Sequence, residues 1–302
     1  MKTRKLVALL GCLLTVCLAA SAAAQGSVET TDMIGNVIAL DAPAQRIVAL
    51  TPSDCEILYA LGAGDTVVGR GEYCDWPAEV LEKPVVQSGA DTNLEQIIAL
   101  EPQVVIMSTM AQTQEQIDAL QAAGIHVVVS DAQDIAGVYE AIALVGDVTG
   151  KQEEAEALVE EMQQAFADIS SAATGDGNKT VYFEVSPLRY GLWTAGTGTF
   201  MDELAQMLGL SNAFSDVQGW AEISEEQVIE RDPDYIITIS MYSGEELTPV
   251  EEILSRASWQ GMKAIQNGAV LNADSNEISR PGPRLVDAAQ TIYAFVYGDT
   301  EE

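Results

Sequence analysis

The chain has 302 residues, of which 48% are hydrophobic, and a formal net charge of −32 from 46 acidic and 14 basic side chains. Its length suggests two domains of about 150 residues each, or one large domain. So acidic a surface repels phosphate backbones and anionic lipid headgroups, which argues against nucleic-acid binding and mainly keeps the protein soluble.

The N-terminus is typical of an exported protein. Three of the first five residues are basic, residues 6–20 form an uncharged apolar run, and small residues follow as far as Ala24. This pattern predicts a signal peptide over residues 1–24 and a location outside the cytoplasm, in the periplasm or at the outer face of the cytoplasmic membrane. Two alternatives stay open. The run is long enough for an anchor helix, and Cys17 stands in a loose lipoprotein signal.

Residues 46–150 alternate short apolar runs with helical segments, after an N-terminal extension over residues 25–45. Strands are predicted at 46–50, 66–69, 104–107 and 126–129, and helices at 55–61, 94–100, 112–123 and 134–147. Ser53 or Asp54 is the expected cap of the first helix. Such alternation predicts βαβ units, and hence an N-terminal α/β lobe with a mainly parallel sheet.

A long amphipathic segment follows. Residues 151–172 predict one acidic helix, which at ~1.5 Å per residue makes a rod of roughly 30 Å. Strand–helix alternation then resumes over residues 179–302, which predicts a C-terminal α/β lobe. The expected fold class is α/β, with two lobes built on mainly parallel central sheets and joined by one long rigid helix.

A repeated pattern marks one helix in each predicted lobe. A capping residue, a Glu two positions later, a short helix, an acid–Pro pair and an apolar strand follow one another from Asn93 and again from Ser224. The cap, the early acid and the proline are all ordinary helix signals, so Glu95 and Glu226 are good first-turn residues on any interpretation. The alternative is that both lobes present matched carboxylates on one surface. The pattern alone leaves the two interpretations even.

Signals of catalysis are weak. His126 is the only histidine, and it opens a predicted buried strand, where a structural role is expected. No Gly-rich phosphate loop follows a strand, and no His/Cys cluster has metal-ligand spacing. We therefore expect no enzyme activity, no protein metal site and no intrinsic cofactor.

Aromatic residues in predicted loops give a better indication of function. They lie just beyond strand ends or before helices, at Tyr73, Trp76, Tyr190, Trp193, Trp220 and Tyr242. Because the ends of parallel strands form the ligand crevice of α/β proteins, these rings suit a large and partly apolar ligand. Trp76, next to Pro77, is expected to be structural. Arg280 has two interpretations: it meets an anionic ligand group, or it pairs with a nearby acid.

Two cysteines, Cys55 and Cys74, follow the predicted signal peptide. Two cysteines in an exported chain are compatible with a disulfide, and both lie near the outlets of neighbouring predicted strands. Two separate thiols are the alternative.

The chain resembles the substrate-binding proteins of iron-complex and vitamin B12 ABC importers from about Arg46 to Tyr297. The segments that carry the resemblance begin at Arg46 (RIVALTPS), Glu56 (EILYALGAG), Tyr73 (YCDWP), Asn93 (NLE), Trp193 (WTAG), Trp220 (WAEISEEQV) and Arg280 (RPGPRLVD). Their order and spacing together make the match specific. The resemblance implies a binding protein whose two lobes hold the ligand and open little, because a helix bridges them.

The resemblance also assigns roles to residues. One Glu per lobe docks onto arginines of the membrane permease, which works with a cytoplasmic ATPase; the matching positions are Glu95 and Glu226. Tyr73 and Trp220 match aromatic positions that contact the corrin, and Trp193 lies where another aromatic is common. Arg280 matches an arginine near the same site.

The ligand implied is a cobalt- or iron-containing complex. One departure weakens the corrinoid assignment, because residues 87–90 (QSGA) replace a segment in which the B12 protein has a further tryptophan. The order of expectation is corrinoid, then ferric siderophore, then haem with Tyr73 as axial ligand. The competing hypotheses are a tetrapyrrole chelatase that uses His126, and a surface adhesion protein. A monomer is expected.

Overall fold

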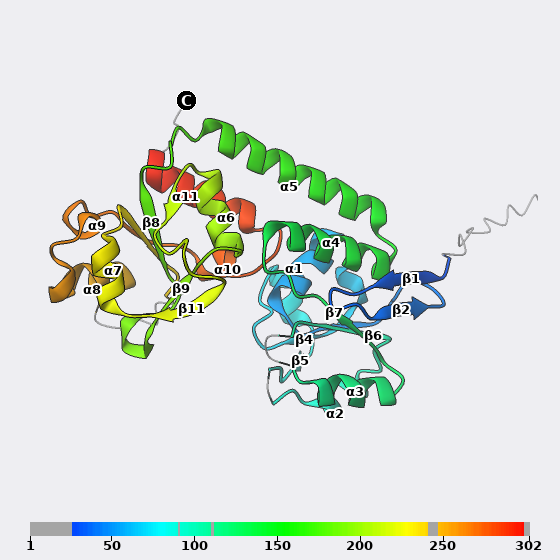
Figure 1. Ribbon diagram of the computed structural model, residues 1–302. Helices are drawn as coiled ribbons and strands as arrows, with labels where there is room; N and C mark the ends of the chain where they lie inside the picture. The colour runs from blue at the N-terminus through cyan, green and yellow to red at the C-terminus, as the bar shows by residue number, and fades with distance from the viewer. Residues whose placement is uncertain (1–25, 90, 110–111, 241–246, 299–302) are drawn as a thin grey trace, which may run out of the picture.

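The computed structural model describes residues 26–89, 91–109, 112–240 and 247–298, and it shows two lobes with one long helix lying across both (Figure 1). The expected signal peptide, Cys17 and Tyr242 lie outside these residues. Within the described part of the chain, no helix combines the length and the hydropathy that a membrane span needs.

The N-terminal lobe is built on a five-stranded parallel sheet in the order β5-β4-β3-β6-β7. The strands are β3 (Ile47–Ala49), β4 (Val67–Gly71), β5 (Val85–Val86), β6 (Val104–Met107) and β7 (His126–Val129). Side chains alternate between the two faces, so β-branched residues cover both. The helices α1 (Pro52–Ala60) and α4 (Ile135–Thr149) cover one face, and α2 (Leu94–Ala99) and α3 (Gln114–Ala122) cover the other.

The expected N-terminal extension folds onto this lobe as an antiparallel hairpin of β1 (Val28–Thr31) and β2 (Val37–Leu40). Its turn is tied to the edge strand β7, because the backbone amide of Val129 donates to Asp32 Oδ2 over 3.1 Å and the amide of Met33 donates to the Val129 carbonyl over 3.1 Å. The hairpin thereby covers part of the sheet edge.

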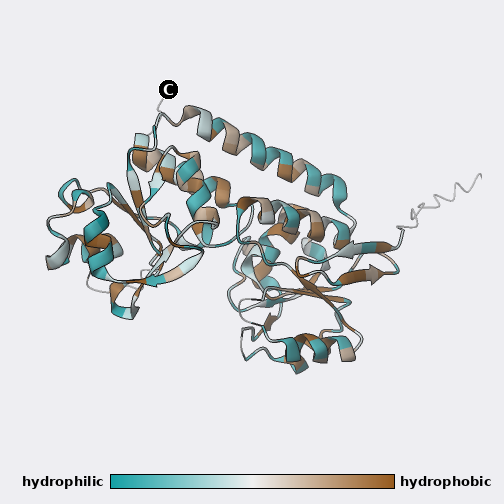
Figure 2. Ribbon diagram, in the orientation of Figure 1, coloured by the Kyte–Doolittle hydropathy of each residue, from teal (hydrophilic) through white to brown (hydrophobic). Residues whose placement is uncertain are grey.

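The C-terminal lobe contains a four-stranded parallel sheet in the order β10-β8-β12-β13 and a separate antiparallel pair, β9 and β11. The strands are β8 (Thr180–Glu184), β9 (Leu192–Ala195), β10 (Ser211–Asn212), β11 (Trp220–Ile223), β12 (Tyr235–Thr238) and β13 (Val270–Asn272). The helices are α6 (Phe200–Met207), α7 (Glu225–Arg231), α8 (Pro249–Ser255), α9 (Lys263–Gln266), α10 (Ser275–Ile278) and α11 (Leu285–Tyr297). The central strands of both lobes are hydrophobic in Figure 2.

The long helix α5 (Gln152–Ala172) connects the lobes by packing on α4 at one end and on α11 at the other. Gly150, with φ +71°, makes the left-handed turn between α4 and α5. Gly146 allows the two helices to approach closely, since a Cβ there would stand 2.6 Å from the Cβ of Ala155. One hydrophobic core runs through both lobes, so the connection is packed and not a free linker. The expected fold class is confirmed, and the residue limits of the domains stay a prediction.

The repeated helices found in the sequence have matching geometry. Asn93 caps α2 by accepting from the amide of Gln96 over 3.1 Å, and Ser224 caps α7 by accepting from the amide of Gln227 over 3.3 Å. Each helix leads to an acid–Pro pair whose acid is left-handed, with φ +49° at Glu101 and +44° at Asp232. These are the two non-glycine residues with positive φ among those described, which supports a structural relation between the lobes.

One local expectation is wrong. Neither Ser53 nor Asp54 caps the first helix, because α1 already begins at Pro52, with Thr51 in the capping position. Proline suits the first turn of a helix, where its missing N–H costs nothing. Asp54 instead lies fully buried inside the lobe.

Candidate functional site

Trp193 and Trp220 lie on the paired strands β9 and β11 and share one face of this ribbon. The prediction that these two tryptophans lie in loops is therefore wrong. The register joins Trp193 to Glu222 and Ala195 to Trp220, and residues opposite each other or two apart on a strand point the same way. The opposite face is buried through Leu192, Thr194 and Ile223. The two indoles therefore stand together on the exposed face, 40% and 37% accessible.

The indole of Trp220 is held from behind by an aromatic ring. The ring centroids of Phe200 and Trp220 are 5.4 Å apart at an interplanar angle of 59°. Phe200 begins α6, and its backbone amide donates to the Gln133 carbonyl of the other lobe over 3.0 Å. The ribbon is thus tied to the contact between the lobes. Tyr190, just before β9, is exposed, and the guanidinium of Arg189 lies over its ring at 4.9 Å.

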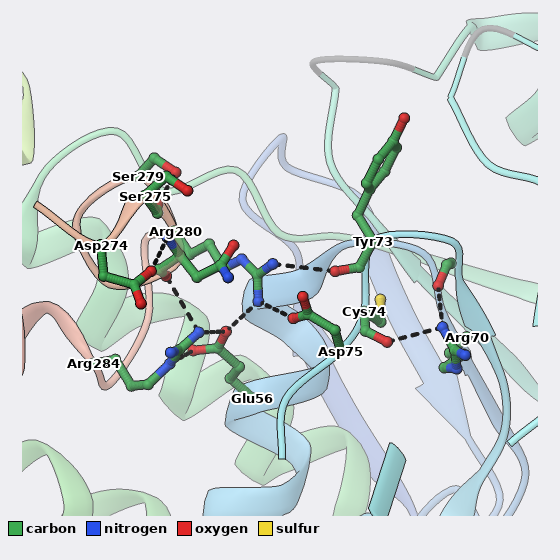
Figure 3. A network of polar contacts seen from close by, with 12 residues as sticks. Glu56, Arg70, Tyr73, Cys74, Asp75, Asp274, Ser275, Ser279, Arg280 and Arg284 are labelled. Atoms are coloured by element: carbon green, nitrogen blue, oxygen red, sulfur yellow. Dashed lines mark hydrogen bonds and ion pairs between the residues drawn. The ribbon is translucent and has the colours of Figure 1, made fainter. Parts of the chain in front are cut away.

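Tyr73 lies in the turn after β4, and its ring points away from a network of polar contacts (Figure 3). The side chain is 70% accessible. Two guanidinium groups fix the backbone of the turn. Arg70, buried below it, donates to the Cys74 carbonyl over 2.9 Å, and Arg280 donates to the Tyr73 carbonyl over 3.2 Å. An exposed ring on an anchored backbone is available to a ligand at low conformational cost.

Arg280 pairs with acids of the other lobe. Its Nη1 donates to Glu56 Oε1 over 2.9 Å and to Asp75 Oδ1 over 2.6 Å. Arg284 donates two hydrogen bonds to Glu56, from Nε to Oε2 over 3.0 Å and from Nη2 to Oε1 over 2.7 Å. Two cations and two carboxylates are therefore balanced in this network, which links α1 and the Tyr73 turn to the segment before α11. Although burial opposes its charge, Asp75 and Glu56 raise the pKa of Arg280.

Trp76 lies beside this network at the junction of the lobes. The guanidinium of Arg284 stands 4.9 Å from the centre of its ring, and the ring stays half exposed. Trp76, Tyr59 and Pro283 line a pocket of about 440 Å³. Trp76 comes from the turn after β4 and not from the ribbon, and the structural role expected for it stays a prediction.

Cys55 and Cys74 are both buried and are free thiols in the structure. Both Sγ atoms face the carbonyl oxygen of Ala49, at 3.9 Å and 3.7 Å. A hydrogen bond with Cys74, followed by burial, raises the pKa of Cys55 well above its usual range, so the protonated thiol is favoured over the thiolate. Their common neighbour confirms that the two residues lie together, and a bridge between them stays a prediction.

Glu95 and Glu226 are exposed in the first turns of α2 and α7. The described residues provide no basic partner for either carboxylate. The backbone amide of Glu226 and the Ser224 hydroxyl lower the pKa of Glu226. The neighbouring Glu225 differs, because its Oε2 accepts from Trp259 Nε1 and from Ser258 Oγ, each over 3.0 Å. Glu225 is thus a packing residue, whereas Glu95 and Glu226 are available to a partner.

His126 is exposed at the start of β7, although the rest of that strand is buried. Its expected burial is wrong because the first residue of the strand lies at the rim of the sheet. Over the ranges that the structure describes, no group of three or more His, Cys, Asp or Glu side chains could hold a metal ion.

Sequence reasoning missed three acids at the site: Glu56 and Asp75, which pair with Arg280, and Glu222, which lies opposite Trp193 and two residues from Trp220. The alternation of exposed and apolar residues in Trp220–Ile223 indicated a half-buried strand and could have placed Glu222 on the same side of that strand as Trp220.

The architecture and the exposed aromatic ribbon define a two-lobed binding protein. The family model described as periplasmic binding protein matches residues 47–277. An uncharacterized ABC transporter substrate-binding lipoprotein of Bacillus subtilis is 35% identical over 85% of this chain and 81% of its own length. A cobalamin-binding protein of Halobacterium salinarum is 29% identical over 86% of this chain and 71% of its own length.

Among solved structures, a possible iron-binding (periplasmic solute-binding) protein of Staphylococcus epidermidis is 30% identical, with a TM-score of 0.72 over 84% of this chain and 99% of that one. The chain therefore belongs to the periplasmic binding protein family. It is an extracytoplasmic substrate-binding protein of an ABC importer, a class that works with a membrane permease and an ATPase.

Proposed function

We propose that this protein captures a metal-containing complex, with a corrinoid favoured, between its two lobes and delivers it to the permease by docking through Glu95 and Glu226. The observation that carries the proposal is the pair of exposed indoles on one face of the β9–β11 ribbon. Large flat rings held at the edge of a lobe suit a large, partly apolar ligand such as a macrocycle.

The other lobe contributes Tyr73. The Tyr73 turn and the ribbon are each connected to a contact between the lobes, Tyr73 through Arg280 and Trp220 through Phe200. We infer that the tyrosine ring meets the ligand from the side opposite the two indoles. A tyrosine hydroxyl is also an axial ligand suited to haem iron, so haem is an alternative, as is a ferric siderophore. The relative named a cobalamin-binding protein supports placing the corrinoid first.

Docking rests on the matched helices. Each presents an exposed carboxylate near the positive end of a helix, at equivalent positions of two related lobes. Two such carboxylates, one per lobe, offer a bivalent contact to paired arginines of a permease, and that contact also fixes the orientation of the bound protein.

Titration of the purified chain with cyanocobalamin, followed by its visible spectrum, tests the capture. We expect saturable binding of one ligand per chain, weakened about ten-fold or more by Trp193→Ala and by Trp220→Ala, because each substitution removes a ring that stacks on the ligand. Trp76→Phe, at the junction of the lobes, is the matched control and should leave the affinity unchanged. The proposal fails if neither cyanocobalamin nor a ferric siderophore nor haemin binds.

A further inference from the structure

Glu222 places an acidic side chain next to each of the two exposed indoles. It lies directly across the ribbon from Trp193 and two residues after Trp220 on the same strand, so all three side chains emerge on one face. Ala195, opposite Trp220, is fully buried, so Trp193, Trp220 and Glu222 are the exposed members of these two cross-strand pairs. A carboxylate in this position faces any ligand that stacks on the rings.

The carboxylate of Glu222 has room and no cationic partner among the residues that the structure describes. Its Oε1 lies 3.7 Å from the point where a Cβ on Gly191 would stand. Gly191 has φ +91°, so its backbone passes beside Glu222 without a side chain of its own. An ionised carboxylate can only accept hydrogen bonds, and here its acceptor capacity is left for a ligand.

The cations that an anionic ligand would need are already engaged. Arg280 and Arg284 are balanced by Glu56 and Asp75, and Arg70 donates to backbone carbonyls below the Tyr73 turn. The guanidinium of Arg189, before β9, lies over Tyr190. Recognition of carboxylates or phosphates normally uses arginines that are free to form paired hydrogen bonds.

We propose that the site selects metal complexes that carry no net negative charge and that present N–H donors, and that Glu222 accepts from those donors between Trp193 and Trp220. This inference rests on the proposed function and adds the charge class of the ligand. The amide groups of a neutral corrinoid and the ammonium group of a cationic hydroxamate siderophore both meet the requirement. The propionates of haem and the charged oxygens of a catecholate siderophore do not.

The test compares three probes on the same purified chain: neutral cyanocobalamin, cationic ferrioxamine B and haemin with its two propionates. We expect the tighter of the first two to bind at least about ten-fold more tightly than haemin. Glu222→Gln should weaken that binding about ten-fold, which is the size of one hydrogen bond to a charged group. Glu230→Gln, an equal charge change on the exposed part of α7, should have no effect.

Glu222→Lys reverses the charge at this position. It should raise the affinity for haemin relative to the affinities for cyanocobalamin and ferrioxamine B. The inference is overturned, with the importer function intact, if haemin binds best to the unaltered chain or if neither substitution at Glu222 changes the order of the probes. If none of the three probes binds to the unaltered chain, both the proposed function and this inference are wrong.

Discussion

Replacing Arg256 by Met is expected to lower the free energy of unfolding by about 3–5 kcal/mol, the usual cost of removing one partner of a buried ion pair. Arg256 forms two hydrogen bonds with Glu184, of 2.7 Å and 2.9 Å, and the two side chains are 3% and 1% accessible. It also binds Glu252 and stacks over Trp259 at 4.3 Å. Without the guanidinium, the carboxylate of Glu184 is left buried at the end of β8.

The loss should depend on pH. Burial already raises the pKa of Glu184 even with Arg256 present, and without Arg256 the pKa rises further. A raised carboxyl pKa means that the folded state holds its proton to higher pH, so the deficit grows as the pH rises above the usual range of glutamate. Urea unfolding of the Arg256→Met variant and of the unaltered chain at pH 5 and pH 8 measures this difference in unfolding free energy.

Two variants serve as controls for the Arg256 result. Arg256→Met with Glu184→Met should recover much of the stability, because no charge is then left unpaired. Lys179→Met breaks the pair with Asp234, in which the lysine is largely exposed, and it should have a far smaller effect. Equal losses in the buried and exposed pairs would contradict the assignment.

Asp54→Asn is expected to stabilise the protein at pH 8. The side chain is fully buried, Oδ2 accepts from Thr51 Oγ1, and Oδ1 has no partner within the described residues. Burial raises the pKa of Asp54 to about 7; the nearby Ser130 hydroxyl lowers this pKa, and the charge of Asp131 raises it further. An ionised Asp54 is therefore unfavourable in the folded chain.

The sign follows from proton linkage. Between pH 3.8 and about 7 the folded state holds a proton that the unfolded state has lost, so the contribution of Asp54 to stability decreases as the pH rises through that window. Above about pH 7, the ionised Asp54 lowers the free energy of unfolding by the full amount, up to about 4 kcal/mol. Asparagine carries no charge and removes this cost.

The measurement is the difference in unfolding free energy between Asp54→Asn and the unaltered chain, taken at pH 5 and at pH 8. The gain should be a few kcal/mol larger at pH 8. Asp176→Asn, at an exposed turn, should show no such difference. A variant that is destabilised to the same degree at both pH values would show that Asp54 is needed as an acceptor and not tolerated as a buried acid.

The parts of the fold that depend on local chemistry could be predicted from the sequence. The caps at Asn93 and Ser224 and the stops at Glu101 and Asp232 act within one helix, and the structure reproduces both copies. The alternation of strands and helices likewise predicted two parallel sheets. These features need no knowledge of which distant segments meet.

The site depends on distant contacts, and there the sequence was insufficient. Arg280 and Glu56 are 224 positions apart, so the choice between a ligand contact and an ion pair depended on how the lobes pack. Trp193 and Trp220 were recognised as aromatic, but the antiparallel register that puts them with Glu222 on one face is a tertiary property. The local pattern indicated that Asp54 was a helix cap. Its burial depends on segments far along the chain, so the local sequence could not show it.

The most direct test of the central claim is uptake of radiolabelled cyanocobalamin by cells that carry this protein and its permease. For a chain with Glu95→Gln and Glu226→Gln, we expect unchanged ligand affinity in solution and uptake reduced about ten-fold or more, because each lobe loses a charged docking contact. The matched control is Glu153→Gln with Glu161→Gln on α5, the same change in net charge on exposed residues of the connecting helix. That control should transport normally. Full uptake by the chain without Glu95 and Glu226 would contradict delivery through these two carboxylates.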